Sequence, residues 1–155
     1  MPGPGGTPYV TQAQLSNYWP APAFNGITIA QQDQACLDAT GEVDGRISGR
    51  YQMPLLAWGN ELTKVTAWIA IYLCFSTRGF NPQNGSDRTI QDRYWEMVGN
   101  PNVPGSIGWL DKVQRQSIHP DITATVPPNQ SPTYNLPQVY SGIPRGWTRL
   151  PGGGL

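Results

Sequence analysis

The sequence predicts a mainly α-helical protein: a small bundle of four main helices around a central apolar helix, with extended Pro/Gly-rich N- and C-terminal arms. Apolar residues recur at helical spacing over residues 28–119. Residues 65–75 are apolar on nearly every face, which is typical of a helix buried on all sides. Proline and glycine crowd both ends of the chain. We therefore expect an N-terminal arm with a short helix over 1–27, a helical core over 28–119 and an extended C-terminal arm over 120–155.

Charge and aromatic content favour a subunit of an assembly. Ten basic and ten acidic residues cancel, and charged residues make up only 13% of the chain. The sequence thus lacks the basic excess that drives sequence-independent nucleic-acid binding. Because little charge repulsion would keep copies apart, six Trp and seven Tyr suit contacts between subunits better than a free monomer.

The cysteines and the apolar run predict a protein made in a cytoplasm. Cys36 and Cys74 fall on apolar helix faces, which favours reduced core residues, with a disulfide as the alternative. The first ten residues lack the basic and apolar regions of a secretory signal. The uncharged run between Lys64 and Arg78 is shorter than the roughly 20 residues that cross a bilayer, so no membrane association is expected.

Thr11 is expected to open a short helical turn, after which prolines return the chain to an extended form. Thr28 and Gln31 form a capping-box pattern that begins the first long helix. The buried face of this helix is predicted from residues at spacings of four, three and four: Cys36, Thr40, Val43 and Ile47.

The other faces of this first long helix carry acidic residues, Asp33, Asp38, Glu42 and Asp44. The simplest interpretation is a solvated surface. In the alternative, Asp38, Glu42 and Asp44 line a channel or a subunit contact. Gly45 and Gly49 then interrupt or end the helix, each costing about 1 kcal/mol relative to Ala. We expect close packing or helix termination to explain them.

The central helix follows an extended elbow at Pro54. We expect Asn60 to cap it and Gly79 to end it. A third helix should begin at Ser86 or Asp87 and end at Val98. Its predicted inward residues are Ile90, Tyr94 and Met97.

Ser106 is expected to cap a fourth helix that ends at His119 and Pro120. Its predicted inward residues are Ile107, Leu110, Val113 and Ser117. Near the last carbonyls of a helix a histidine interacts favourably with the helix dipole, so a helix-end role is predicted for His119 rather than catalysis.

No catalytic, cofactor or metal site is predicted. Two cysteines and one histidine lack zinc-site spacing, and the glycine-rich ends lack the context of a phosphate-binding loop. Asp87 and Asp92 accompany Arg88 and Arg93, which indicates exposed helix ion pairs rather than an acid and base couple. We therefore expect no enzymatic activity.

Several large side chains suit contacts. Trp68, Trp95 and Trp109 are interpreted as core or subunit-contact aromatics rather than a ligand box. For the three arginines that flank the central region, pairing with acids of an adjacent subunit and plain surface exposure are equally open: Arg46, Arg50 and Arg78.

The C-terminal arm carries anchors without a core of its own. Ordering a chain costs roughly 1–2 kcal/mol per residue in backbone entropy, which a Pro-rich segment regains only against other surfaces. We expect the arm to dock on another protein, most strongly through Trp147 and Arg149. The full predicted partner-binding set is Tyr134, Leu136, Tyr140, Ile143, Trp147, Arg149 and Leu150.

Residues 28–118 carry a distinctive series of motifs. An acidic helix leads into D-G-R-I-S-G-R-Y at 44–51, followed by Met53-Pro54-Leu55 and then the apolar helix. Later come D-R-Y-W-E-M at 92–97 and I-G-W-L-D-K-V at 107–113. This pattern resembles the head-tail connector proteins, also called adaptor or head-completion proteins, of Mu-like prophages and many long-tailed phages. The two arms are not part of that family's common core.

The resemblance implies a structural role in the virion neck, after assembly in the host cytoplasm. Such proteins form a homo-oligomeric ring of about twelve copies beneath the portal protein. The ring joins the head to a tail or stopper protein and continues the channel for double-stranded DNA, which passes without sequence-specific binding. An acidic face of Asp38, Glu42 and Asp44 would suit the channel wall because it repels phosphates.

Two alternatives differ in partner or class. A tail-completion or terminator protein would also form rings. A DNA-binding packaging regulator would use a helix-turn-helix over 87–118, although its four basic residues are offset by acids. Salt-dependent binding to random DNA would favour the regulator.

Overall fold

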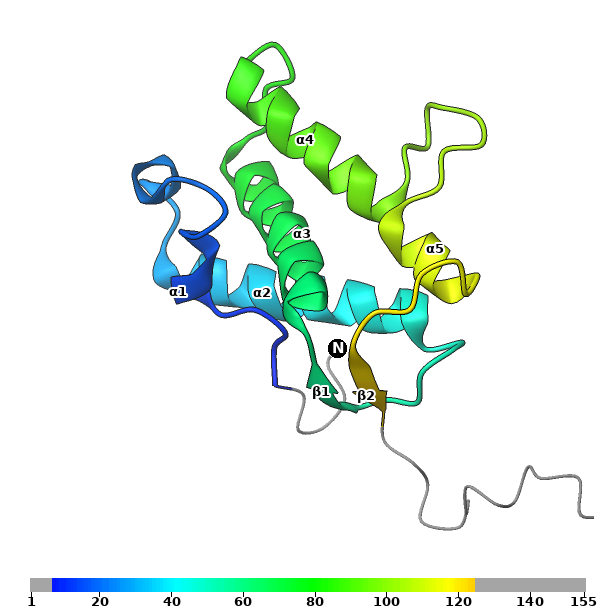
Figure 1. The fold of residues 1–155 in the computed structure, drawn as a ribbon. Coiled ribbons are helices and arrows are strands. Elements are labelled where there is room, and N and C mark those ends of the chain that lie inside the picture. Colours follow the sequence, from blue (N-terminus) through cyan, green and yellow to red (C-terminus); the bar gives the residue numbers. More distant parts are fainter. Residues whose placement is uncertain (1–6, 125–155) are drawn as a thin grey trace, which may run out of the picture. The chain divides into compact units, whose positions relative to one another are not determined.

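The computed structural model describes residues 7–124 and confirms a mainly helical fold (Figure 1). The elements in chain order are α1 (Gln12–Leu15), a 3-10 turn (Ala21–Phe24), α2 (Ile29–Ile47), β1 (Leu55–Trp58), α3 (Asn60–Arg78), α4 (Gly85–Val98), α5 (Trp109–Gln114) and β2 (Ile122–Ala124).

The apolar helix α3 lies at the centre, as predicted. It packs against α1, α2 and α4, and Figure 1 shows it between α2 and α4. Every residue from Val65 to Ile71 is buried, as are Cys74 and Phe75. Gly79 follows the last turn with a φ of 107°, a conformation that favours glycine, and it ends the helix. Gly59 is the N-cap and Asn60 the first helical residue, one position from the prediction.

Helix α2 begins with the predicted capping box. Gln31 N–H donates to Thr28 Oγ1 over 3.2 Å, and Thr28 N–H donates to Gln31 Oε1 over 2.8 Å. The predicted inward residues, Cys36, Thr40, Val43 and Ile47, are all buried.

Of the two glycines near the end of α2, Gly45 departs from the prediction, whereas Gly49 lies just after the C-cap residue Ser48. Gly45 lies inside the helix, and a Cβ built there would meet nothing within 4 Å. Neither close packing nor termination therefore explains Gly45. Gly49 follows the helix end, and its Cβ would lie in ordinary contact with Gln114 at 3.5 Å.

The cysteines are free and buried, in α2 and α3. Burial raises the pKa of Cys36 to about 12 and that of Cys74 to about 11. Among residues 7–124, no helix is long and apolar enough to span a membrane.

The described part of the N-terminal arm, residues 7–27, is packed onto the helices instead of extended. Val10 is fully buried and Leu15, Phe24 and Ile27 are nearly so. The Tyr9 ring meets the Trp58 ring edge-on at a centroid distance of 4.6 Å. Because these apolar residues are separated by prolines and turns, they show no periodicity, yet their burial offsets the ordering of the segment.

A two-stranded antiparallel sheet replaces part of the predicted loops. β1 pairs with β2, with Leu55 opposite Ala124 and Trp58 opposite Ile122. Gly59 N–H also donates to the Asp121 carbonyl over 2.8 Å. Residues 121–124 thus belong with the core rather than with an arm. Strands of four and three residues are too short to give a sequence periodicity.

Helix α4 matches its predicted span, but α5 is shorter than predicted. Gly108, not Ser106, is its N-cap, and it ends at Gln114. Ile107 is 39% exposed and Ser117 is exposed, so their predicted inward positions are wrong. Only Leu110 and Val113 of that set are buried. A Cβ at Gly108 would lie 2.3 Å from Gly99 N, so the two backbones are in close contact there. The residues between them, 101–107, are exposed.

Candidate subunit-contact surface

The arginines that carry the motif at 44–51 have partners inside the chain. Arg46 donates to the carbonyl of Val98, the last residue of α4, over 3.3 Å. It also pairs with Glu42 at 3.3 Å and Asp111 at 3.7 Å. Since carbonyls at the end of a helix lack intrahelical partners, Arg46 caps α4 and ties it to α2 and α5.

Arg50 makes the equivalent contact with the end of α5. It donates to the carbonyls of Val113 and Ile118, the second over 2.9 Å, and its guanidinium lies 2.6 Å from His119 Nδ1. His119 is exposed, five residues beyond the end of α5. The predicted helix-end role of His119 is therefore wrong.

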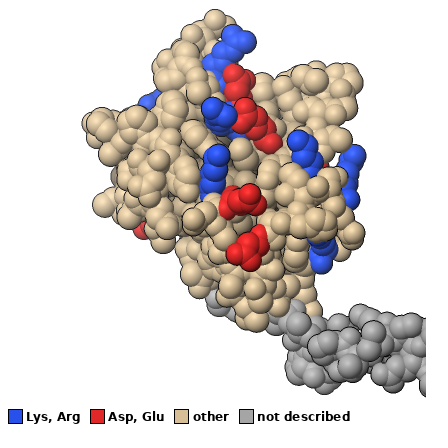
Figure 2. Space-filling model, in the orientation of Figure 1, with Lys and Arg blue, Asp and Glu red and all other residues tan. Residues whose placement is uncertain are grey.

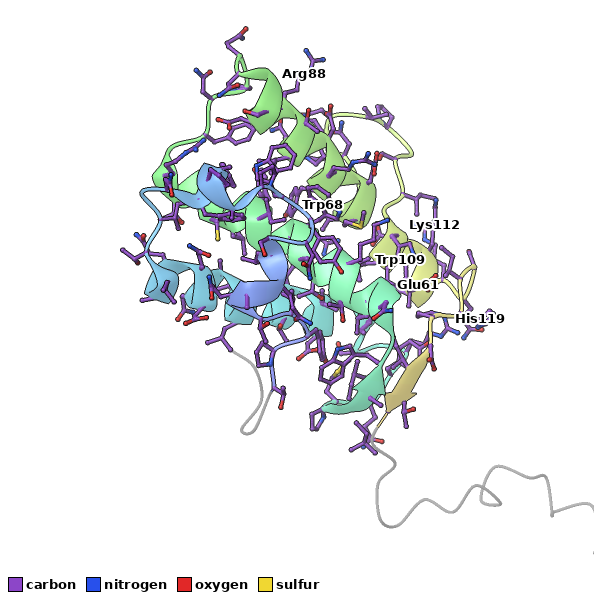
Figure 3. The ribbon with its side chains drawn as sticks, turned by 60° about the vertical axis from the view of Figure 1, so that its left-hand side comes forward. Glu61, Trp68, Arg88, Trp109, Lys112 and His119 are labelled. Carbon is purple, nitrogen blue, oxygen red and sulfur yellow. The ribbon has the colours of Figure 1, made fainter. Side chains whose placement is uncertain are left out.

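Arg78 pairs with Asp87 over 3.1 Å and lies 4.4 Å from the centroid of the Phe75 ring. Asp87 is 1% exposed and also accepts the Asn81 N–H over 3.0 Å. The prediction of an exposed pair between Asp87 and Arg88 is wrong, because Asp87 anchors the turn before α4. Arg88 points away from α4 (Figure 3).

Arg93 forms an exposed pair with Glu96 at 2.9 Å. Arg46, Arg50 and Arg78 each have partners inside the chain, and Arg78 is also exposed, one of the two options considered for it. Each one fastens two segments of its own chain.

The three acids considered for a channel wall do not share one face. Asp38 is exposed and accepts from Gln34 over 2.7 Å. Glu42 is bound by Arg46 and by the hydroxyl of Tyr94. Asp44 lies on the opposite side of the buried stripe of α2.

The hydroxyl of Tyr9 donates to Asp44. Burial raises the pKa of Asp44, and the bond from Tyr9 opposes that shift. Burial is also the main cause of the raised pKa of Tyr9. Asp44 therefore holds the N-terminal segment on α2.

Tyr94 bridges α4 to both other long helices. Its ring stacks on Tyr72 of α3 at 4.0 Å with an interplanar angle of 11°, and its hydroxyl donates to Glu42 over 3.2 Å. Burial and the charge of Glu42 raise the pKa of Tyr94 to about 12. Tyr72 and Tyr94 line a groove together with Trp95 and Asn100.

A second groove lies on the outer side of α4, and we call it the α4–α5 groove. Its lining combines apolar and charged side chains: Asp92, Trp95, Glu96, Asn100, Val103, Ser106, Ile107 and Lys112. Val103 is 52% exposed and Ile107 is 39% exposed. Among the described residues, only Ile29 and Leu56 are other large hydrophobic side chains with such exposure. Two of these four exposed apolar side chains of residues 7–124 therefore line one groove.

Loop 99–108 presents these apolar side chains in a defined conformation. Asn100 N–H donates to Ser106 Oγ over 2.9 Å, and Asn102 N–H donates to Asn100 Oδ1 over 2.9 Å. The loop is thus tied by its own polar groups while Val103 and Ile107 face solvent. The loop therefore leaves two apolar side chains exposed beside one groove. The sequence analysis missed it, because Val103 stands in a turn and Ile107 fitted a helical period.

The predicted contact tryptophans divide between core and surface. Trp68 is 8% exposed and meets Trp19 edge-on at 6.2 Å, so it belongs to the core. Trp95 and Trp109 are half-buried, and Trp95 lines the α4–α5 groove. The predicted C-terminal partner-binding set, from Tyr134 to Leu150, lies outside the described residues.

Charges of both signs are interspersed on the face shown in Figure 2, without a large patch of one sign. In the described part of the chain, no group of three or more His, Cys, Asp or Glu residues could hold a metal ion. Other surface features of the described residues are exposed apolar side chains and several grooves, two of them beside α4.

Comparison with known proteins identifies a family. A family model described as "Bacteriophage Mu, Gp36" matches residues 9–133, which is most of the chain. The match starts at Tyr9, the residue that begins the packed N-terminal segment. No curated protein matches the chain.

Proposed function

Because the chain belongs to the bacteriophage Mu Gp36 family, we propose that this phage protein is a structural head-tail connector. In this role, copies form a ring of about twelve subunits between the portal protein and a tail or stopper protein. The ring lies in the neck of the virion and continues the DNA channel. It carries out no catalysis.

The observation that supports this proposal most is the α4–α5 groove. A small protein that holds Val103 and Ile107 outward on a hydrogen-bonded loop gains from covering them with another protein surface. Arg46 and Arg50 of the 44–51 motif bind backbone carbonyls within the chain. In this proposal the motif therefore stabilises the fold, and the loops make the contacts with other proteins.

The charge distribution suits the surface of a channel through which DNA passes without being bound. The chain has no net charge, and both signs of charge are present on the face shown in Figure 2. Such a surface lacks the concentrated positive charge that holds the phosphate backbone. DNA retention assays at low and high salt should accordingly show little binding to random double-stranded DNA.

Deleting the gene in its phage tests the assignment. A connector defect should yield DNA-filled heads and complete tails that remain unjoined, as seen by electron microscopy, and adding the purified protein should join them. Immunogold labelling of intact particles should place the chain at the neck. Mass measurement of the neck complex should give about twelve copies.

Other outcomes would point to the alternatives. Tails of irregular length with normal heads would favour a tail-completion protein. Empty heads together with salt-sensitive DNA binding would favour a packaging regulator. Normal particles that lack the chain would contradict every structural role in the virion.

A further inference from the structure

The groove lined by Tyr72, Tyr94 and Trp95, which we call the aromatic groove, offers flat rings and unused hydrogen-bond donors. The two tyrosine rings stack at 4.0 Å. Neither the indole N–H of Trp95 nor the side-chain amide of Gln91, which also lines the groove, makes a hydrogen bond within residues 7–124. Tyrosine and tryptophan combine a large apolar surface with a polar edge. The groove is therefore suited to an apolar segment whose backbone carbonyls accept hydrogen bonds.

Charge excludes several classes of ligand from the aromatic groove. Among the described residues, its one charged lining residue is Arg46. The Arg46 guanidinium is already paired, with Glu42 at 3.3 Å and with Asp111 at 3.7 Å. A phosphate would therefore meet no unpaired cation in the lining, and a basic peptide would meet no acid there. The groove favours an uncharged ligand.

The sequence that follows the described fold contains a segment of this chemistry. Residues 122–144 include no charged side chain, and four prolines fall within residues 127–137. Proline-rich segments bind aromatic-lined grooves as extended polyproline II chains, whose preformed backbone lowers the entropy lost on binding. The sequence of residues 127–137 therefore matches the aromatic groove in both charge and apolar character.

The length of the chain beyond β2 allows this segment to reach another copy. A domain of this size has a radius of gyration of about 13 Å and hence a diameter of about 35 Å. A polyproline II chain advances about 3.1 Å per residue, so the stretch from Ala124 to Pro137 spans about 40 Å. It starts from β2, at the lower end of the fold in Figure 1, with α4 above it. Residues 127–137 are thus long enough to enter a groove on an adjacent copy.

We propose that residues 127–137 of one copy bind in the aromatic groove of the adjacent copy. The prolines and Tyr134 pack on the rings of Tyr72 and Trp95, while Trp95 and Gln91 donate hydrogen bonds to backbone carbonyls of the segment. The contact joins unlike surfaces, so it continues from copy to copy and can close a ring. This inference rests on the proposed function, because it supplies the lateral contact of the connector ring.

Crosslinking between two kinds of copy tests the contact. Particles are assembled from equal amounts of two full-length chains, one with Gln91→Cys in the groove and one with Thr133→Cys in the segment, and are treated with a short bismaleimide. The native cysteines are buried, at 2% and 1% exposure, and do not compete. We expect dimers of one chain of each kind, identified by mass spectrometry of the linked peptides. Particles made with either variant alone should give monomers.

Gln34 provides a matched control because it is an exposed glutamine on α2 that does not line the aromatic groove. Gln34→Cys chains mixed with Thr133→Cys chains should give no dimers, and an equal yield from this control would overturn the contact. So would crosslinking of Thr133→Cys to a different phage protein. A link within one chain of the double variant Gln91→Cys and Thr133→Cys, without dimers from the mixture, would overturn binding between copies.

Removing the indole N–H provides a second test. In dilute solution few grooves are occupied, so the dimer yield from purified full-length chains follows the affinity of the contact. Adding Trp95→Phe to the Gln91→Cys chain keeps a ring but removes one donor, and should lower the yield about two- to tenfold. Trp109→Phe, at a half-buried residue outside the groove, should leave the yield unchanged. Equal yields from the two variants would contradict the role of Trp95.

Failure of the contact and failure of the proposed function are distinguishable. If the wild-type chain lies in the neck but the mixed variants give no dimers, the groove contact is overturned and the connector function stands. Absence of the wild-type chain from the neck would instead refute the connector function.

Discussion

Besides the apolar core, several single polar side chains connect elements of the fold. Arg46, Arg50 and Arg78 each reach a carbonyl or a carboxylate of another segment. Their shared feature is a partly buried guanidinium, whose fork of donors can satisfy several acceptors at once. The arginines of the family motif therefore stabilise the fold of their own chain.

The buried carboxylate of Asp87 gives the sharpest prediction at this scale. Replacing Asp87 by Ala removes its bonds to Arg78 and to the Asn81 N–H, which leaves both donors without their acceptor. We expect the free energy of unfolding in urea to fall by about 1.5–3 kcal/mol. Asp92→Ala, on the exposed side of the same helix, should change it by less than about 0.5 kcal/mol. Equal effects would contradict a structural role for Asp87.

Tyr94 predicts a loss of stability at alkaline pH. Its pKa in the folded protein is about 12, raised from 10.0. Between these values the unfolded chain has released the proton that the folded chain retains, so the free energy of unfolding falls as pH rises. We expect Tyr94→Phe to lose less stability than the wild type between about pH 9 and about pH 11 in urea titrations. An identical loss in both proteins would contradict this interpretation of Tyr94.

At the scale of the elements, glycines decide how closely segments approach. Gly108 lies where a Cβ would meet Val98 C at 2.4 Å and Met97 O at 2.6 Å. These neighbours are backbone atoms, which cannot turn aside as a flexible side chain can. Gly45, in the exposed part of α2, faces open space.

These two glycines should respond oppositely to the same substitution. Gly108→Ala is expected to lower stability by about 1–3 kcal/mol, because the start of α5 must move away from the end of α4. Gly45→Ala should raise stability by roughly 0.5–1 kcal/mol, because a helix interior favours alanine. Thermal and urea unfolding measure both. A stabilised Gly108 variant would show that the two segments separate at little cost.

At the scale of the whole molecule, the described core is closed by segments from both ends of the fold. Its buried apolar residues run from Tyr9 to Val113. The β1–β2 pair then ties residues 122–124 to the segment before α3. Residues 122–124 therefore belong with the described core, beyond the expected end of the core at residue 119.

Truncations test that boundary. A chain that ends at Ala124 should keep the helical circular dichroism spectrum and the stability of the full chain, while its attachment to a neighbouring phage protein should weaken. A chain that ends at Pro120 loses three cross-strand pairs and the bond from Gly59, which should lower stability by about 1–3 kcal/mol. Full attachment of the chain that ends at Ala124 would contradict a docking role for the arm.

Helices α2, α3 and α4 could be predicted from the sequence by itself. Their caps are local, as at Thr28 with Gln31, and their inward residues repeat at a spacing that helix geometry imposes. The same residues also carried the resemblance to a phage family, which the match over residues 9–133 supports at the level of that family.

Only the tertiary structure decided the rest. Whether Asp87 is buried, whether Ile107 faces solvent and whether residues 122–124 pair with β1 all depend on segments distant in the sequence. Burial and strand pairing are properties of two surfaces in contact, so a short segment such as β2 carries no periodic signal of its own. The α4–α5 groove could not be predicted either, because its lining residues come from α4, the following loop and α5, which meet only in the folded chain.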